Sequence, residues 1–178
     1  MKLVQNTTDI PDTEVERILK EVEAGGDLSV AVMVRNCWKG NYFAGTFHHN
    51  YNGFIRIAKG QVRRSPGAEK WGCNHMITLR LPVVGPWLDM KLHKIHPGGG
   101  ILVIHIPTRE AGLQLLAAHE FEHVRTQEGR IPQSEMVCDL VMLHEAEEMG
   151  LEVTKEEYPK PPISEHATYA AYVEAKED

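Results

Sequence analysis

The pattern of apolar and polar positions divides the chain into a helical start, a β-rich middle and a helical second half. The first helical segment follows Asp12, begins with the capping-box pair Thr13 and Glu16, and ends at Gly25-Gly26. Its apolar positions recur at i, i+3, i+4 and i+7, and they are Val15, Ile18, Leu19 and Val22.

The middle of the chain contains short apolar and β-branched runs separated by turn residues. These runs predict strands over 28–34, 42–47, 54–58, 76–81 and 101–106. The turn residues at 48–53 predict a hairpin between the second and third of these strands. The polar stretch 59–75 is the most basic part of the chain, and we expect it to form a solvated loop or to bind an acidic partner.

Two adjacent helices are predicted in the second half. Thr108 is the expected N-cap of a helix over 109–128, and Pro132 begins a second helix that Gly150 ends. An acidic, proline-rich link follows over 152–162, and Ser164 begins a last helix. This order predicts an α+β fold with one domain over 1–162 and a helical tail over 163–178.

Composition fits a cytoplasmic enzyme or binding protein better than a membrane or nucleic-acid-binding protein. The 178 residues carry a net charge of −6, whereas a dedicated nucleic-acid binder is normally basic. Three widely spaced cysteines do not indicate a disulfide framework, and neither a signal peptide nor a membrane-spanning run is evident. Nothing in the composition indicates an oligomeric state. The ten histidines are many for this length, which draws attention to metal binding.

The motif that carries chemistry is His119-Glu120-Phe121-Glu122-His123, an H-E-x-x-H sequence inside the predicted helix over 109–128. Residues four apart on a helix differ by only about 40° around its axis, so both imidazoles can reach one Zn²⁺. Glu120 lies beside them, where it can take a proton from an attacking water.

A third protein ligand is needed, because a catalytic zinc usually has three of them and one open position. The second helix supplies the candidates Glu135, Cys138 and Asp139 in the segment EMVCD. If that helix returns antiparallel, Glu135 and Asp139 come level with the histidine pair. We favour Glu135 as the ligand and Asp139 as acceptor of an imidazole N–H, while Asp139 or Cys138 as the third ligand stays open.

HEFEH followed by EMVCD resembles the gluzincin metallopeptidases, and the order of elements is similar to minigluzincins and ImmA/IrrE-type peptidases. The resemblance covers residues 100–150 at the level of motifs. It implies a zincin-like fold, with an N-terminal helix, a mixed or antiparallel sheet, the H-E-x-x-H helix and an adjacent helix bearing the Glu ligand. It further implies that His119, His123 and Glu135 bind zinc and that Glu120 is the general base.

These observations predict a zinc metallopeptidase that acts on a peptide or protein. His105, in the strand before the metal-site helix, is a candidate for substrate contact in the cleft, although a structural role is the simpler interpretation. No residue stands out as the donor that would stabilise the transition-state oxyanion. Two alternatives therefore remain: a non-catalytic, zinc-stabilised regulatory or interaction module, and a metal-free α+β binding protein.

Overall fold

The computed structural model describes residues 1–37, 40, 42–48, 54–56, 62–64, 68, 70–93, 100–126 and 132–157. Within these ranges the chain forms an α+β fold with one mixed sheet and two antiparallel sheets. The predicted tail over 163–178, its helix after Ser164 and the boundary at 162 lie outside the described residues. The helices are α1 (Asp12–Glu23), α3 (Arg109–Thr126) and α4 (Pro132–Glu148).

The mixed sheet has four strands in the order β1-β2-β6-β3. Its two central strands pair in parallel over their whole length, from Val30 opposite His75 to Cys37 opposite Pro82. β1 adds in parallel to one edge, and β3 adds antiparallel to the other edge. The strands are β1 (Lys2–Asn6), β2 (Val30–Cys37), β3 (Ala44–His48) and β6 (His75–Pro82).

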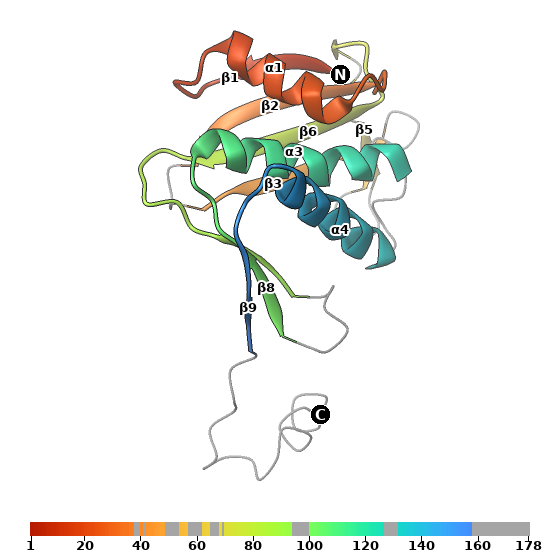
Figure 1. The fold of residues 1–178 in the computed structure, drawn as a ribbon. Coiled ribbons are helices and arrows are strands. Elements are labelled where there is room, and N and C mark those ends of the chain that lie inside the picture. Colours follow the sequence, from red (N-terminus) through yellow and green to blue (C-terminus); the bar gives the residue numbers. More distant parts are fainter. Residues whose placement is uncertain are drawn as a thin grey trace.

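Helices α1 and α3 cover one face of this sheet, and the main core lies between them and the strands (Figure 1). Apolar side chains at alternate positions of β2 and β6 point into this core, as the period of a half-buried strand requires. Phe121 of α3 is the largest fully buried side chain. The core thus fixes α3 against the sheet, and α3 is the helix that carries the H-E-x-x-H sequence.

A three-stranded antiparallel sheet, in the order β7-β8-β9, packs against the other side of α3 and against α4 (Figure 1). Its strands are β7 (Met90–Leu92), β8 (Ile101–Ile104) and β9 (Val153–Glu156). A second apolar cluster fills this space and consists of Leu92, Ile104, Ile106, Leu115, Met142 and Ala146. This cluster holds α3 and α4 together next to the H-E-x-x-H sequence of α3.

Several predicted elements are confirmed and others are wrong. Thr108 caps α3, because its Oγ1 accepts a hydrogen bond of 3.1 Å from the Ala111 N–H, and α4 begins at Pro132 as predicted. The predicted capping box at Thr13 is wrong, since α1 begins one residue earlier with Pro11 at its N-cap and no side-chain cap. Ala24, in the left-handed region, ends that helix just before Gly25.

The largest corrections concern strand pairing. β3 does not form a hairpin with β4 (Phe54–Arg56), because it pairs with β6 instead, while β4 pairs with β5 (Val62–Arg64). The basic stretch predicted as a loop over 59–75 therefore contains a strand, and the predicted link over 152–162 begins with β9. β1 and β7 were not predicted, because neither has a clear alternating pattern and both depend on pairing with distant strands.

Candidate metal centre

Helix α3 carries the two histidines of the H-E-x-x-H sequence on one face. Their rings lie 5.0 Å apart, centroid to centroid, in an edge-to-face arrangement. His123 is buried and His119 is partly buried. Phe47 of β3 stacks on His123 at 5.7 Å with nearly parallel rings, so the edge strand also holds this imidazole in place.

The Glu135 carboxylate, in the first turn of α4, contacts both imidazoles. Its Oε2 lies 3.3 Å from His119 Nε2, and its Oε1 lies 2.8 Å from His123 Nε2. Two donors bound to one tetrahedral zinc at about 2.0–2.2 Å would lie about 3.3–3.5 Å apart. Each imidazole nitrogen therefore lies within about 0.7 Å of ligand spacing from one oxygen of the Glu135 carboxylate.

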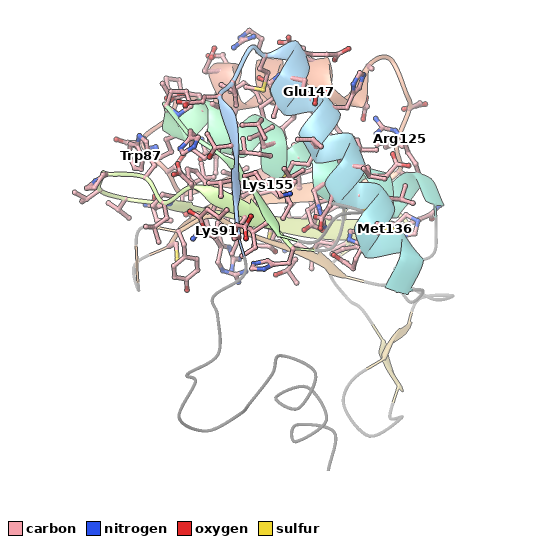
Figure 2. The ribbon with its side chains drawn as sticks, turned by 60° about the horizontal axis from the view of Figure 1, so that its bottom comes forward. Trp87, Lys91, Arg125, Met136, Glu147 and Lys155 are labelled. Atoms are coloured by element: carbon pink, nitrogen blue, oxygen red, sulfur yellow. The ribbon has the colours of Figure 1, made fainter. Side chains whose placement is uncertain are left out.

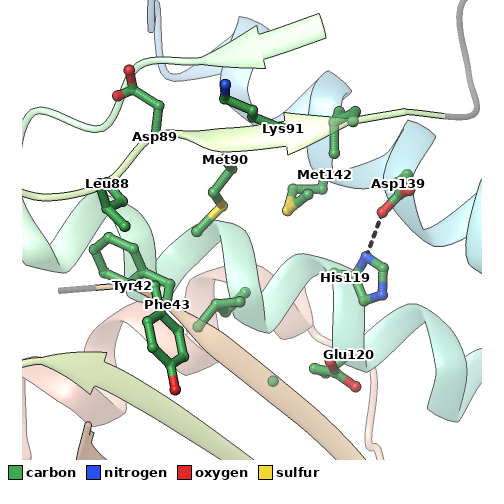
Figure 3. A pocket seen from close by; sticks show the side chains of 13 residues that line it. Tyr42, Phe43, Leu88, Asp89, Met90, Lys91, His119, Glu120, Asp139 and Met142 are labelled. Atoms are coloured by element: carbon green, nitrogen blue, oxygen red, sulfur yellow. Dashed lines mark ion pairs between the residues drawn. The ribbon is translucent and has the colours of Figure 1, made fainter. Parts of the chain in front are cut away.

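Asp139 lies one turn further along α4 and faces the other nitrogen of His119. Its Oδ1 is 3.0 Å from His119 Nδ1, the contact drawn as a dashed line in Figure 3. Such a carboxylate fixes the ring orientation and leaves Nε2 available to a metal. Burial lowers the pKa of His119, but Asp139, Glu120 and Glu135 together outweigh this effect and raise it.

Cys138 is the second candidate for a third ligand. It is fully buried, and its Sγ and one ring nitrogen each of His119 and His123 all lie within 4.8 Å of one another. This His₂Cys group is close enough to bind a metal ion. Burial, reinforced by nearby carboxylates with Glu135 first, raises the pKa of Cys138 to about 12. The thiol is thus protonated at neutral pH without a metal, and it would have to lose this proton to bind one.

Glu120 lies beside the histidines and is only 5% exposed. Burial raises the pKa of Glu120 to about 7; the charge of His119 opposes this shift and that of Glu135 adds to it. A carboxyl with a pKa near neutrality can both take and give a proton, which general acid–base catalysis requires.

The space for the Glu120 carboxylate is created by Gly45 on strand β3. A Cβ atom at this position would lie 2.2 Å from Glu120 Oε1 and 2.8 Å from its Cδ, which is far inside van der Waals contact. Sequence analysis did not single out Gly45. The only signal was a glycine inside a predicted strand, a position that often marks close approach of another group.

Two solvent-open cavities meet at Gly45, His119 and Glu120. The first has a volume of about 360 Å³, and it extends from these residues to β7 and to Met142 of α4 (Figure 3). The second has a volume of about 320 Å³ and extends from these residues toward Phe47, His123 and Glu135. It is lined by Gly45, Thr46, Phe47, His119, Glu120, His123 and Glu135. The candidate metal ligands are thus reachable from solvent.

His105, the candidate for substrate contact, lines neither of these cavities. Its Nδ1 lies 3.0 Å from Asp89 Oδ2, and its Nε2 lies 2.8 Å from Thr154 Oγ1. These contacts tie the residue after β8 to β9 and to the segment before β7. The structural interpretation therefore accounts for His105, and a contact with substrate stays a prediction.

Comparisons of the chain with models of known protein families, with curated proteins and with solved structures found no match. Among the described residues, no helix has both the length and the apolar character needed to cross a membrane. The interpretation of the site therefore depends on its own geometry and chemistry.

Proposed function

We propose that the chain is a zinc-dependent metallopeptidase with a zincin-like fold and a gluzincin-type site. His119, His123 and Glu135 would hold Zn²⁺, and Asp139 would orient His119. The observation that carries the proposal is the Glu135 carboxylate, which lies against the Nε2 atoms of both histidines. Two imidazoles and one carboxylate are a donor set of catalytic zinc sites, in which a fourth position remains open.

Glu120 supports hydrolysis rather than metal binding alone. When bound, Zn²⁺ would polarise the scissile carbonyl and lower the pKa of a water molecule. Glu120 is positioned at the meeting point of the two cavities, where its carboxylate can accept the proton of the attacking water and deliver it to the leaving nitrogen.

A peptide is the substrate that best fits the surroundings of Glu120. β3 is an edge strand of the mixed sheet, so one side of its backbone is not paired within that sheet. An extended peptide can add to such an edge by main-chain hydrogen bonds. Gly45 places this strand directly against the Glu120 carboxylate, which would bring the main chain of the peptide to the general base.

One observation favours a second candidate function, a zinc-stabilised module without turnover. If Cys138 joined His119, His123 and Glu135 as a fourth ligand, no coordination position would be left open, as in structural zinc sites. Glu120 would then have no role in the function, and its replacement would change nothing.

Replacement of Glu120 distinguishes the two functions. The zinc-loaded protein is tested on a general peptide library, with and without a chelator, and zinc content is measured in parallel. We expect Glu120→Gln to retain zinc and to lose hydrolysis, whereas His119→Ala loses both. Glu122→Gln is the matched control, since Glu122 lies on the same helix and contacts Arg125 at 3.5 Å. Unchanged hydrolysis in Glu120→Gln would contradict the mechanism.

A further inference from the structure

Helix α4 presents two different ligand atoms to the histidine pair of α3. The Glu135 carboxylate contacts the Nε2 atoms of His119 and His123 at 3.3 and 2.8 Å. The Cys138 thiol also faces the pair, because its Sγ and one nitrogen of each ring all lie within 4.8 Å of one another. Glu135 and Cys138 are three residues apart, so they share one side of the helix. Each of them can complete a set of three ligands with the two imidazoles.

The two groups differ in their access to solvent. The Glu135 side chain is 53% exposed and lines the second cavity, whereas Cys138 is fully buried and lines neither cavity. Met136, near the beginning of the same helix (Figure 2), lies on its exposed side. An ion that enters through the second cavity therefore meets the histidines together with an accessible carboxylate and an enclosed thiol.

The thiol can reach an ion that the two imidazoles hold. A nitrogen and a sulfur bound to one ion at about 2.0 and 2.3 Å lie about 3.5 Å apart. The limit of 4.8 Å leaves at most about 1.3 Å to close, which small rotations of the three side chains can supply. A set of two imidazoles and one thiolate is therefore within reach of the fold as it stands.

Carboxylate and thiolate differ in the cations that they prefer. Zn²⁺ accepts both kinds of ligand. Cu⁺ is a softer ion that prefers thiolate sulfur and imidazole nitrogen, while carboxylates suit harder ions such as Mg²⁺, Ca²⁺ and Mn²⁺. Of the two groups on α4, Cu⁺ should therefore select the Cys138 sulfur.

The charge of the resulting group favours the same choice. Cu⁺ bound by one thiolate and two neutral imidazoles has no net charge. The buried position of Cys138 suits such a group, since an uncompensated charge is costly to bury. The half-exposed Glu135 carboxylate can then remain in contact with solvent.

We infer that the centre also binds Cu⁺, through His119, His123 and the thiolate of Cys138, and that Cu⁺ and Zn²⁺ exclude each other because they share both histidines. On binding, the Cys138 S–H bond breaks, its proton passes to solvent and a copper–sulfur bond forms, with no change in the oxidation state of copper. One consequence, that Cu⁺ stops peptide hydrolysis by displacing Zn²⁺, rests on the proposed metallopeptidase function.

The first experiment compares the two metals on the same pair of variants of the full chain. Affinity for Zn²⁺ is measured by competition with a chelator of known affinity. Affinity for Cu⁺ is measured with a copper(I)-specific chelator, in ascorbate and without oxygen. Cys138→Ser should weaken Cu⁺ binding by about 100-fold or more and leave Zn²⁺ binding unchanged, whereas Glu135→Gln should do the reverse.

Cys37→Ser and Cys73→Ser are the matched controls for Cys138→Ser. Cys37 is also buried and Cys73 is partly buried, and neither belongs to the group around the histidines. Both variants should keep wild-type affinity for Cu⁺ and for Zn²⁺. Wild-type zinc affinity also shows that Cys138→Ser is folded, and Cys138→Ala replaces it if it is not.

A second experiment identifies the ligands in the wild-type protein. With one equivalent of Cu⁺, X-ray absorption at the copper edge should show a copper–sulfur bond. At the zinc edge, the zinc-loaded protein should show only nitrogen and oxygen ligands. Addition of Cu⁺ to the zinc-loaded protein should release one Zn²⁺ for each Cu⁺ bound, and peptide hydrolysis should fall in proportion.

The outcomes separate this inference from the proposed function. Opposite effects of Cys138→Ser and Glu135→Gln on the two metals, with release of zinc by Cu⁺, support it. Wild-type Cu⁺ affinity in Cys138→Ser, equal loss of both metals in that variant, a copper centre without sulfur, or Cu⁺ bound alongside zinc overturns it and leaves the peptidase function standing. A zinc-loaded protein that hydrolyses no peptide contradicts the proposed function alone, because the metal affinities are measured without turnover.

Discussion

Glu135→Gln is the substitution that tests the metal centre most directly. Glutamine keeps the size of the side chain but removes the negative charge that faces both imidazoles. In the structure the two carboxylate oxygens lie 3.3 and 2.8 Å from the two Nε2 atoms, near ligand spacing. Cys138 Sγ also lies within 4.8 Å of the imidazole nitrogens, but burial raises the pKa of its thiol to about 12, and a thiol must lose its proton before it binds zinc. We therefore expect Glu135→Gln, rather than Cys138→Ser, to weaken zinc binding.

The size of the effect follows from the role of the side chain. Mutation of a residue that only supports a metal ligand typically costs about 10–100-fold in affinity, so loss of a ligand should cost about 100-fold or more. A 100-fold weaker affinity removes about 2.7 kcal/mol of zinc-linked stabilisation when zinc is in excess. In a chain of 178 residues this corresponds to a decrease of about 5–10 °C in the zinc-bound Tm.

Two measurements check this expectation. Zinc affinity is measured by competition with a chelator of known affinity, and thermal unfolding is followed with zinc and with the chelator. Glu148→Gln is the control, because Glu148 is an exposed glutamate at the other end of α4 whose 3.3 Å contact with His144 is remote from the site. The Tm difference between variant and wild type should appear with zinc and shrink in the chelator.

The reasoning is refuted by the opposite pair of results. If Glu135→Gln binds zinc like the wild type while Cys138→Ser loses it, the third ligand is the thiolate. If both substitutions weaken binding to a similar extent, four protein groups bind the metal, and the non-catalytic function is favoured.

Three further predictions address the surroundings of the site. Asp139→Asn should weaken zinc binding by about 10–100-fold in the same competition assay, because the support of His119 Nδ1 is changed; an unchanged affinity would exclude this role. Gly45→Ala should retain zinc but lower the kcat for peptide hydrolysis by about 100-fold, since its Cβ displaces the Glu120 carboxylate; normal kcat would contradict the proposed position of Glu120. Phe121→Ala should lower the free energy of unfolding by about 3–5 kcal/mol in denaturant titrations, because the ring is fully buried; a much smaller loss would contradict its place in the core.

The helices that carry the site could be predicted from the sequence because their signals are local. Thr108 at the N-cap of α3, Pro132 at the start of α4 and Gly150 after its end each act through neighbouring backbone groups. The spacing of His119, Glu120 and His123 on a helix needs no tertiary information. The proximity of Glu135 to both histidines followed from one further assumption, an immediate return of the chain after α3.

The strands were harder to predict because pairing, rather than local pattern, makes them strands. β1 has an irregular pattern, and it is ordered by parallel pairing with β2, in which Lys2 lies opposite Ala31, 29 residues further along the chain. β9 is a mostly exposed, charged segment that pairs with β8. The turn residues after β3 suggested a hairpin, but β6 offered a longer partner, with five paired positions from Ala44 to His48.

The same dependence on distant pairing explains why Gly45 was missed. β3 and the preceding Phe43 lie so close to α3 that two glycines leave no room for a side chain: a Cβ at Gly45 would meet Glu120, and a Cβ at Gly112 would lie 2.2 Å from the Phe43 ring. Glycine weakens both strands and helices, so two such residues at one contact are a cost to stability. The cost is explained if the close approach serves the site, since it brings an edge strand against Glu120, the proposed general base. The H-E-x-x-H sequence identifies the histidines and the glutamate of the candidate site. The long-range pairing of β3 with β6 determines which residues of β3 lie against them.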